Sequence, residues 1–298
     1  AKAEAHVLNE QQQELIDEFR EDFLREDHKT YLLHGITGSG KTEVYLAAIE
    51  EVIKQGKQAI VLIPEIALTY QTVTRFTKRF GERVSILNSR LSKGERYDQW
   101  LRAQRGDVDV IIGPRSALFV PFSNLGLIVI DEEHEGAYKS ETAPRYDARE
   151  VAKVRADMSG AAVVLGSATP SVESYYLAEQ GEYKLLTLTK RAKENSRLAG
   201  VHIVDLREEL AEGNRSIFSR RLKGLIEDRL ANRQQVMLFM NRRGYAGFVS
   251  CRSCGKAMKC PHCDVSLTYH KNGRLKCHYC GFERPLPDRC PSCGSPFI

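Results

Sequence analysis

Short apolar runs alternate with amphipathic stretches through the first part of the chain. Each run is too short for a helix and is followed by a polar loop, whereas the stretches between runs place apolar residues at helical spacing. This alternation is typical of a parallel sheet covered by helices on both faces, and it predicts an α/β fold. The predicted strands are Tyr31–His34, Ala59–Ile63, Val108–Ile112, Leu125–Ile130 and Ala162–Leu165, and the predicted helices include Glu43–Gln55, Leu68–Phe80 and Gly94–Gln104.

The pattern differs before and after this region. Asn9 and Gln12 have the spacing of a capping box, and apolar residues at helical intervals follow them, which predicts a helix before the first strand. Later in the chain, a helix over Arg220–Ala231 and a strand over Val236–Met240 precede a segment rich in cysteine. We therefore expect three parts, over residues 1–188, 189–250 and 251–298.

Polar motifs follow five of the predicted strands. Ligands of parallel sheets bind beyond the carboxyl ends of the strands, and the unusual polar motifs of this chain begin at those ends. Five motifs directed at one edge indicate a site more strongly than any of them alone. They are Gly35–Thr42, Pro64–Thr69, Gly113–Ser116, Asp131–His134 and Ser167–Thr169.

The first motif matches the phosphate-binding pattern G-x-x-x-x-G-K-[ST], between a predicted strand and a predicted helix. Backbone N–H groups of such a loop surround the phosphates, and the helix N-terminus favours negative charge. The lysine is expected to neutralise the β and γ phosphates of ATP and the threonine hydroxyl to bind Mg²⁺. The residues are Gly35, Ile36, Thr37, Gly38, Ser39, Gly40, Lys41 and Thr42.

An acidic cluster ends the most apolar strand. Asp131 is expected to hold Mg²⁺, directly or through water, and Glu132 to orient and deprotonate the attacking water. A charged strand-to-helix cap is the alternative interpretation of this cluster. Glu133 has no assigned role, and we expect its side chain to be solvated.

Composition and the length of the apolar runs argue against a membrane protein, and the start of the sequence argues against a secreted one. Hydrophobic residues make up 42% and charged residues 28% of the chain, which is typical of a globular protein. The longest apolar runs, such as Leu125–Ile130, are too short to cross a bilayer, and no secretory leader opens the sequence. We therefore expect a cytoplasmic protein rather than a membrane or secreted one.

All 8 cysteines lie in residues 251–298, as four Cys-x-x-Cys pairs. Without a secretory leader this spacing favours metal over disulfides, and four pairs can bind two Zn²⁺ ions in three pairings. The 13 residues between Cys263 and Cys277 suit a hairpin that returns to one metal, which leaves the outer pairs for the second. The nested sites are Cys260, Cys263, Cys277 and Cys280 for one ion, and Cys251, Cys254, Cys290 and Cys293 for the other. Iron–sulfur or redox chemistry is the alternative.

The charge of the cysteine-rich part does not by itself indicate DNA binding. Residues 252–298 hold eight Lys or Arg and three Asp or Glu, a surplus of five that equals the net charge of +5 of the whole chain. Eight thiolates and two Zn²⁺ ions would add about −4, so the loaded module would be nearly neutral.

The motifs together resemble those of superfamily 2 helicases. Besides the phosphate loop and the acidic cluster, these motifs are Ile63–Thr69 (motif Ia), Gly113–Phe119 (motif Ib), Gly166–Ser171 (motif III) and Leu238–Ala246. With the cysteine pairs that follow, the order is similar to that of the bacterial replication-restart helicases. The resemblance implies a RecA-like ATP-binding lobe over residues 1–188, the beginning of a second lobe over residues 189–250, and the nested zinc arrangement.

The resemblance also implies roles for single residues. Lys41, Asp131 and Glu132 would be catalytic, and Gln12, with a register uncertain by one residue, would contact the adenine. Residues expected to couple the nucleotide to DNA are His134, Ser167 and Thr169; those expected to contact DNA are Thr69, Arg115, Tyr138, Lys139, Arg145 and Tyr146. An ordinary surface loop is the alternative for the segment that contains the tyrosines.

The implied activity is ATP-dependent 3′-to-5′ DNA unwinding in replication restart. Implied partners are forked and single-stranded DNA, single-stranded-DNA-binding protein, and primosome and helicase-loader proteins, near the bacterial nucleoid. We expect the chain to be a fragment without the later arginines of the second lobe, and therefore to bind ATP but hydrolyse it slowly, because such arginines contribute about 10³–10⁵ in rate. The alternatives are a docking scaffold for DNA and proteins without motor activity, and a double-strand translocase.

Overall fold

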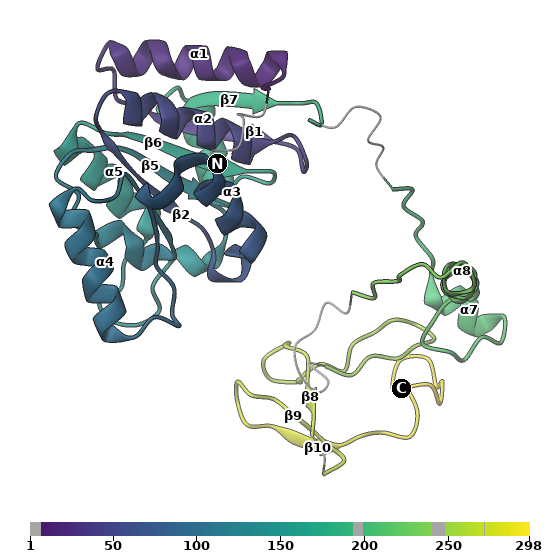
Figure 1. Ribbon diagram of the computed structural model, residues 1–298. Helices are drawn as coiled ribbons and strands as arrows, with labels where there is room; N and C mark the ends of the chain where they lie inside the picture. Colours follow the sequence, from purple (N-terminus) through teal and green to yellow (C-terminus); the bar gives the residue numbers. More distant parts are fainter. Residues whose placement is uncertain (1–6, 193–198, 240–247, 271) are drawn as a thin grey trace. The chain divides into compact units, whose positions relative to one another are not determined.

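The computed structural model describes residues 7–192, 199–239, 248–270 and 272–298. The chain divides into two compact units, with the boundary between residues 197 and 198. Figure 1 labels most of the helices and strands of each unit. Within the described part of the chain, no helix is both long enough and apolar enough to span a membrane.

The first unit is built on a seven-stranded sheet in which all pairings are parallel (Figure 1). The strand order is β3-β4-β2-β5-β6-β1-β7, and the five predicted strands form its middle, which confirms the predicted α/β fold. The two strands that the sequence did not predict lie at the edges, where a strand is short or half-exposed and lacks a continuous apolar run. The strands are β1 (Thr30–Gly35), β2 (Gln58–Leu62), β3 (Val84–Ile86), β4 (Val110–Gly113), β5 (Leu125–Asp131), β6 (Ala162–Ser167) and β7 (Lys184–Leu188).

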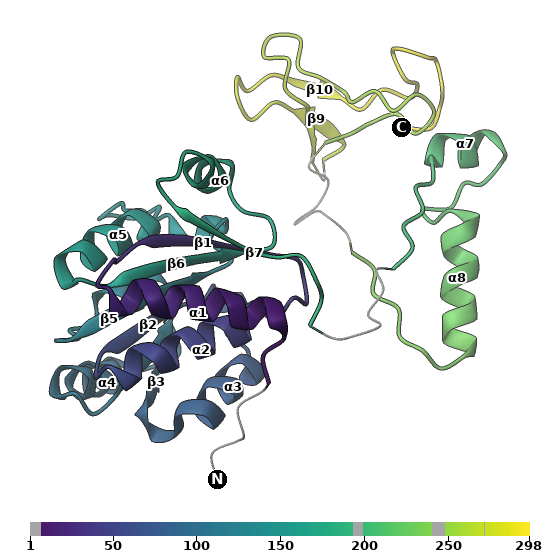
Figure 2. The same ribbon diagram turned by 90° about the horizontal axis from the view of Figure 1, so that it is seen from above.

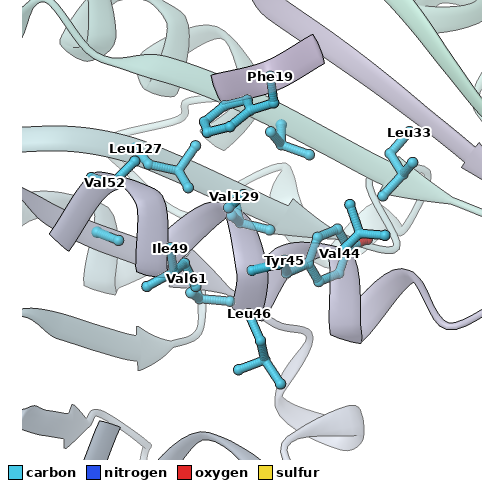
Figure 3. Packing of buried hydrophobic residues seen from close by; sticks show 14 of the residues in the cluster. Phe19, Leu33, Val44, Tyr45, Leu46, Ile49, Val52, Val61, Leu127 and Val129 are labelled. Atoms are coloured by element: carbon cyan, nitrogen blue, oxygen red, sulfur yellow. The ribbon is translucent and has the colours of Figure 1, made fainter. Parts of the chain in front are cut away.

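Helices cover both faces of this sheet and create two cores. Successive strand residues point to opposite faces, so Leu33 belongs to one core and Leu32 to the other. Figure 3 shows side chains of the first core, among them Phe19 of α1 and Ile49 of α2. The first core contains α1 (Glu10–Leu24), α2 (Lys41–Lys54) and α3 (Tyr70–Phe80); the second contains α4 (Lys93–Arg105), α5 (Ala148–Ser159) and α6 (Val172–Glu179).

Side-chain caps fix where the helices begin. In α1 the Asn9 side chain accepts the N–H of Gln12 at 2.9 Å, and the Gln12 side chain accepts the N–H of Asn9 at 3.0 Å, as the sequence predicted. Ser92 and Glu95 form the same capping box at the start of α4. These bonds satisfy N–H groups that have no partner within the helix.

The described residues of the second unit form two helices and a small antiparallel sheet with the order β10-β9-β8. Figure 2 labels both helices and the strands β9 and β10. Arg252 links the helical part to the cysteine-rich part by donating to the carbonyl oxygens of Arg215, at 3.0 Å, and Ser216, at 2.8 Å. The elements are α7 (Leu206–Ala211), α8 (Arg220–Ala231), β8 (Thr268–Tyr269), β9 (Arg274–Lys276) and β10 (Glu283–Pro285).

The predicted strand over Val236–Met240 is wrong for its described residues. Residues 236–239 are not part of any strand, and the side chains of Met237 and Phe239 are largely exposed. A strand needs a neighbouring strand to accept its hydrogen bonds, and the described residues offer none to this segment. Residues 240–247, which include most of the predicted second-lobe motif, lie outside the described residues.

Candidate functional site

The phosphate-binding motif forms the turn from β1 into α2. Gly38 and Gly40 have φ values of 80° and 84°, in the left-handed region that glycine adopts without strain. The ammonium group of Lys41 donates to the carbonyl oxygen of Gly35 at 2.9 Å, and the hydroxyl of Ser39 is buried with no partner in the described part of the chain. A glycine-rich turn at a helix N-terminus, with a lysine and an unused donor, fits a polyphosphate ligand.

Gln12 connects α1 to this loop. Its Nε2 donates to the carbonyl oxygen of Ser39 at 2.9 Å, and a Cβ at Gly40 would lie only 2.2 Å from that nitrogen. The side chain is 3% exposed, and its Oε1 already caps α1. Gln12 therefore supports the loop, and one N–H of its amide is left for a ligand.

A pocket of about 470 Å³ opens in front of the phosphate loop, within the size range of small-molecule sites. Its lining combines Lys41 and Thr42 of the loop with Asp131 and Glu132 from the end of β5. Arg75 of α3 also lines it. The sequence did not predict this residue, because α3 follows β2 whereas the predicted nucleotide motifs follow β1 and β5.

Tyr45 fixes the orientation of Asp131. Its hydroxyl donates to Asp131 Oδ1 at 2.9 Å. A Cβ at Gly166 would lie 1.6 Å from the same hydroxyl, so only glycine leaves room for it. Gly166, directly opposite Asp131 in the β5–β6 pairing, was the signal in the sequence for this close approach.

Burial changes the acidity of both carboxylates. It raises the pKa of Asp131 above its usual value, and the hydrogen bond from Tyr45 and the charge of Lys41 do not offset it. Burial, with the charge of Asp131, also raises the pKa of Glu132. A carboxylate whose pKa is raised accepts a proton more readily, as a general base requires.

His134 joins the acidic cluster to the end of β6. Its Nδ1 and the Ser167 hydroxyl share a 2.7 Å hydrogen bond, and Nδ1 lies 3.7 Å from Glu132 Oε2. The N–H of Thr169 donates to the same serine oxygen at 2.9 Å. The structure thus brings the three predicted coupling residues into one chain of contacts.

Glu133 is not solvated, contrary to the expectation from sequence. Its side chain is 0% exposed and accepts the N–H of Ser171 at 2.6 Å and the hydroxyl of Ser174 at 2.9 Å. Arg149 lies 3.4 Å from the same carboxylate. The sequence did not predict this role, because the donors Ser171 and Ser174 lie 38 and 41 residues later in the chain.

The segment after the acidic cluster corrects one predicted DNA contact. Tyr138 is 1% exposed, and its hydroxyl donates to the carbonyl oxygens of Leu62, at 3.1 Å, and Asp131, at 2.5 Å. Its ring is therefore not available to stack on a base. Arg115 holds this segment by donating to the carbonyl oxygens of Ala137 and Lys139, both at 2.9 Å.

The other predicted DNA contacts lie at the surface. Thr69 caps α3 by accepting the N–H of Thr72 at 3.3 Å and is exposed, as are Lys139 and Arg145. Tyr146 is half-buried, with its ring edge-to-face against Phe119 at 5.3 Å between centroids. These side chains are accessible to a ligand in a way that Tyr138 is not.

The eight cysteines gather in two groups of four with the nested arrangement. In each group the sulfur atoms lie within 4.8 Å of one another. The distances Cys251–Cys293 and Cys260–Cys280 are both 3.6 Å, close to the roughly 3.8 Å that a Zn–S length of 2.3 Å gives in a tetrahedron. The first group is Cys251, Cys254, Cys290 and Cys293, and the second is Cys260, Cys263, Cys277 and Cys280.

Each Cys-x-x-Cys pair is held in the same turn. The N–H of the first cysteine donates to the carbonyl five residues later, and its carbonyl accepts the N–H four residues later. The residue at that fourth position has positive φ, and it is Gly255, Gly281 or Gly294 in three turns and Asp264 in the other. Because an all-sulfur donor set with this spacing fits tetrahedral zinc, both groups suit Zn²⁺.

Comparison with known proteins identifies the family of the chain. A family model described as "Type III restriction enzyme, res subunit" matches residues 5–172, and one described as "PriA DNA helicase Cys-rich region (CRR) domain" matches residues 260–285. Replication restart protein PriA of Bacillus subtilis (strain 168) is 52% identical over 298 residues, which is 100% of this chain. The chain belongs to the PriA family. PriA of Synechocystis sp. is 47% identical over 90% of the chain.

The chain is shorter than these PriA relatives. It spans 37% of the Bacillus subtilis protein and 33% of the Synechocystis protein. Among solved structures, RecG bound to a three-way DNA junction is similar, with a TM-score of 0.49 and 23% identity over 70% of this chain and 28% of that one.

Proposed function

We propose that the chain carries the ATP-binding lobe and the zinc module of an ATP-dependent DNA helicase that acts in replication restart. The observation that carries the proposal is the pocket in which Lys41, Asp131 and Glu132 meet, in a chain of the PriA family. ATP with Mg²⁺ is the ligand that this combination of groups favours.

Each group has a proposed task in ATP hydrolysis. The backbone N–H groups of the loop and Lys41 bind the phosphates, Thr42 and Asp131 hold Mg²⁺, and Glu132 takes a proton from the attacking water. The N–H that remains on Gln12 contacts the adenine. Two structural Zn²⁺ ions stabilise the cysteine-rich module and leave no coordination position for catalysis.

Coupling to DNA is proposed to pass through His134, Ser167 and Thr169. DNA contacts are proposed for residues on the same edge of the sheet: Thr69, Arg115, Lys139, Arg145 and Tyr146. The hydrogen bonds of Arg115 to Ala137 and Lys139 support this, because these residues flank Tyr138, whose hydroxyl donates to the carbonyl oxygen of Asp131.

The chain spans 37% of its Bacillus subtilis relative, so the activities and partners of the longer protein are proposed as well. They are 3′-to-5′ unwinding, binding of forked DNA, contacts with single-stranded-DNA-binding protein and with primosome and helicase-loader proteins, and a place in the cytoplasm near the nucleoid. The boundary of the second lobe near residue 189 is proposed likewise. Slow ATP hydrolysis by the chain alone is also part of the proposal.

The test is the effect of DNA on nucleotide binding. A helicase lobe predicts that forked DNA changes the affinity for ATP–Mg²⁺ several-fold, and that Ser167→Ala removes this effect while both ligands still bind. Ser159→Ala, at an exposed position of α5, is the control. DNA binding that is unaffected by ATP and by Lys41→Ala would contradict the proposal and favour the docking scaffold.

A further inference from the structure

A second pocket opens at the same edge of the first unit, beyond the ends of β2, β3 and β4. It measures about 540 Å³. Apolar residues line part of it, among them Ile63, Leu87 and Val120. The aromatic residues Trp100 and Phe119 also line it, beside several polar residues. An apolar cavity with a few polar groups is the usual form of a ligand site.

Trp100 is the single tryptophan of the chain and sits on α4. It is 42% exposed, and its indole N–H has no partner in the described part of the chain. Phe119 is 54% exposed, and its ring packs edge-to-face against Tyr146, which does not line the pocket. Large exposed aromatic surfaces in a pocket are available to stack on a planar ligand.

Arginines stand at the border of this pocket. Arg96 donates to the carbonyl oxygens of Asn88, at 3.4 Å, and Ser89, at 3.2 Å, which holds its guanidinium in place. Arg115, whose guanidinium donates to the carbonyl oxygen of Ala137, also lines the pocket. Glu65 is the acidic group in the lining, but its carboxylate accepts the N–H of Ser89 at 3.0 Å and faces Arg96.

We propose that this pocket binds one unstacked base of single-stranded DNA, with the base against Trp100 and the adjoining phosphates at Arg96 and Arg115. The inference rests on the proposed DNA-binding function and adds a base-binding position to it. Aromatic surfaces beside arginines are the combination by which proteins bind single strands regardless of sequence, since every base has a π-face. A base within a duplex is stacked on both sides and cannot enter such a pocket.

The single tryptophan makes the test direct. In the full zinc-loaded chain, titration with a dT12 oligonucleotide is expected to quench the fluorescence of Trp100. Trp100→Ala is expected to weaken dT12 binding about 5- to 150-fold, the range measured for the loss of one stacked base. Trp100→Phe, which keeps an aromatic surface, should restore most of the affinity.

Tyr97→Ala is the matched control, because Tyr97 lies on the same helix, is 59% exposed and does not line the pocket. It should bind dT12 as the wild type does. Replacing the thymines by abasic sugars should weaken the wild type but not Trp100→Ala, since that variant has already lost the base contact.

The outcomes separate the inference from the function on which it rests. Failure of the wild type to bind dT12 would overturn the proposed DNA binding itself. Binding of dT12 without a change in fluorescence, together with equal affinities of Trp100→Ala and Tyr97→Ala, would overturn the base pocket alone. If Trp100→Ala fails to fold, Phe119→Ala provides the same comparison from the other aromatic side chain.

Discussion

Glu133 accepts the backbone N–H of Ser171 at 2.6 Å and thereby ties the end of β5 to the start of α6. The carboxylate is fully buried, and the hydroxyl of Ser174 donates to it as well. The loop after β5, which lines the nucleotide pocket, is therefore held to the loop after β6 by a residue that does not itself line the pocket.

Removal of this carboxylate should destabilise the first unit. Glu133→Ala removes the acceptor of the Ser171 N–H and of three side-chain donors, those of Ser171, Ser174 and Arg149. We expect the free energy of unfolding to fall by about 2–4 kcal/mol. Glu133→Gln, which keeps one acceptor oxygen, should lose less. Urea denaturation measures both, with Glu135→Gln two residues along the chain as control; equal stability of Glu133→Ala and the wild type would contradict this role.

Gly166 should not tolerate a side chain. In Gly166→Ala the new Cβ would lie 1.6 Å from the Tyr45 hydroxyl, and displacement of that ring also breaks its bond to Asp131. Overpacking of this kind costs about 3 kcal/mol. Thermal unfolding checks it against Gly94→Ala, where a Cβ meets nothing within 4 Å. Similar melting temperatures of the two variants would show that the site relaxes without cost.

Two aspartates should show opposite dependence of stability on pH. Burial raises the pKa of Asp131 above its value in the unfolded chain. Between the unfolded and the folded pKa the folded state binds more protons, so the protein loses stability as pH rises through that range. Asp131→Asn should therefore be more stable than the wild type near neutral pH, and the difference should vanish in acid. Urea denaturation of both proteins from about pH 3 to about pH 7, the range in which carboxyl groups titrate, measures this difference in stability.

Asp147 is the control of opposite sign. Burial acts to raise its pKa, but hydrogen bonds from Arg149 outweigh this and lower it. The stability that it contributes is present above the unfolded pKa and is lost as pH falls through the folded one. Asp147→Asn should thus be less stable than the wild type at neutral pH. The same sign for both variants would contradict the assigned environments.

Zinc removal should unfold the cysteine-rich module and leave the first unit folded. The core of the module consists of cysteines with few apolar residues, such as Met258, Leu267 and Leu275, which cannot stabilise it without metal. A chelator should release two Zn²⁺ per chain, as measured by a colorimetric zinc assay, and ATP binding should persist.

Single substitutions refine this expectation. Cys277→Ser should lower the zinc content to about one ion per chain, because a Cys₄ site with three sulfurs binds weakly. His278→Ala, in the same turn but outside both cysteine groups, should keep both ions. Zinc loss in His278→Ala, or none in Cys277→Ser, would contradict two sites made of cysteines alone.

The sequence predicts what depends on neighbours along the chain. The five central strands are buried on both faces and therefore leave continuous apolar runs, and the phosphate loop is one contiguous segment. The Cys-x-x-Cys turns are equally local. Edge strands β3 and β7 were missed, because a strand with one open side needs fewer apolar residues.

Side chains whose partners lie far away in sequence could not be placed in this way. Glu133 is buried by Ser171 and Ser174, 38 and 41 residues later, and Tyr45 meets Asp131, 86 residues later. Tyr138, between basic residues, has the pattern of a DNA-binding aromatic, yet its partner Leu62 is 76 residues earlier. A local pattern gives the residue types at such positions but not their surroundings.

Equilibrium binding of ATP–Mg²⁺ to the chain, measured by competition with a fluorescent ATP analogue, shows whether the phosphate loop binds the nucleotide. Lys41→Ala should weaken the affinity for ATP about tenfold or more, because it removes one charge-assisted contact to phosphate. Lys54→Ala, at the exposed end of α2, should leave the affinity unchanged. Asp131→Asn should remove the dependence on Mg²⁺. ATP binding of equal strength in Lys41→Ala, Lys54→Ala and the wild type would contradict the claim that the phosphate loop of this chain is its nucleotide site.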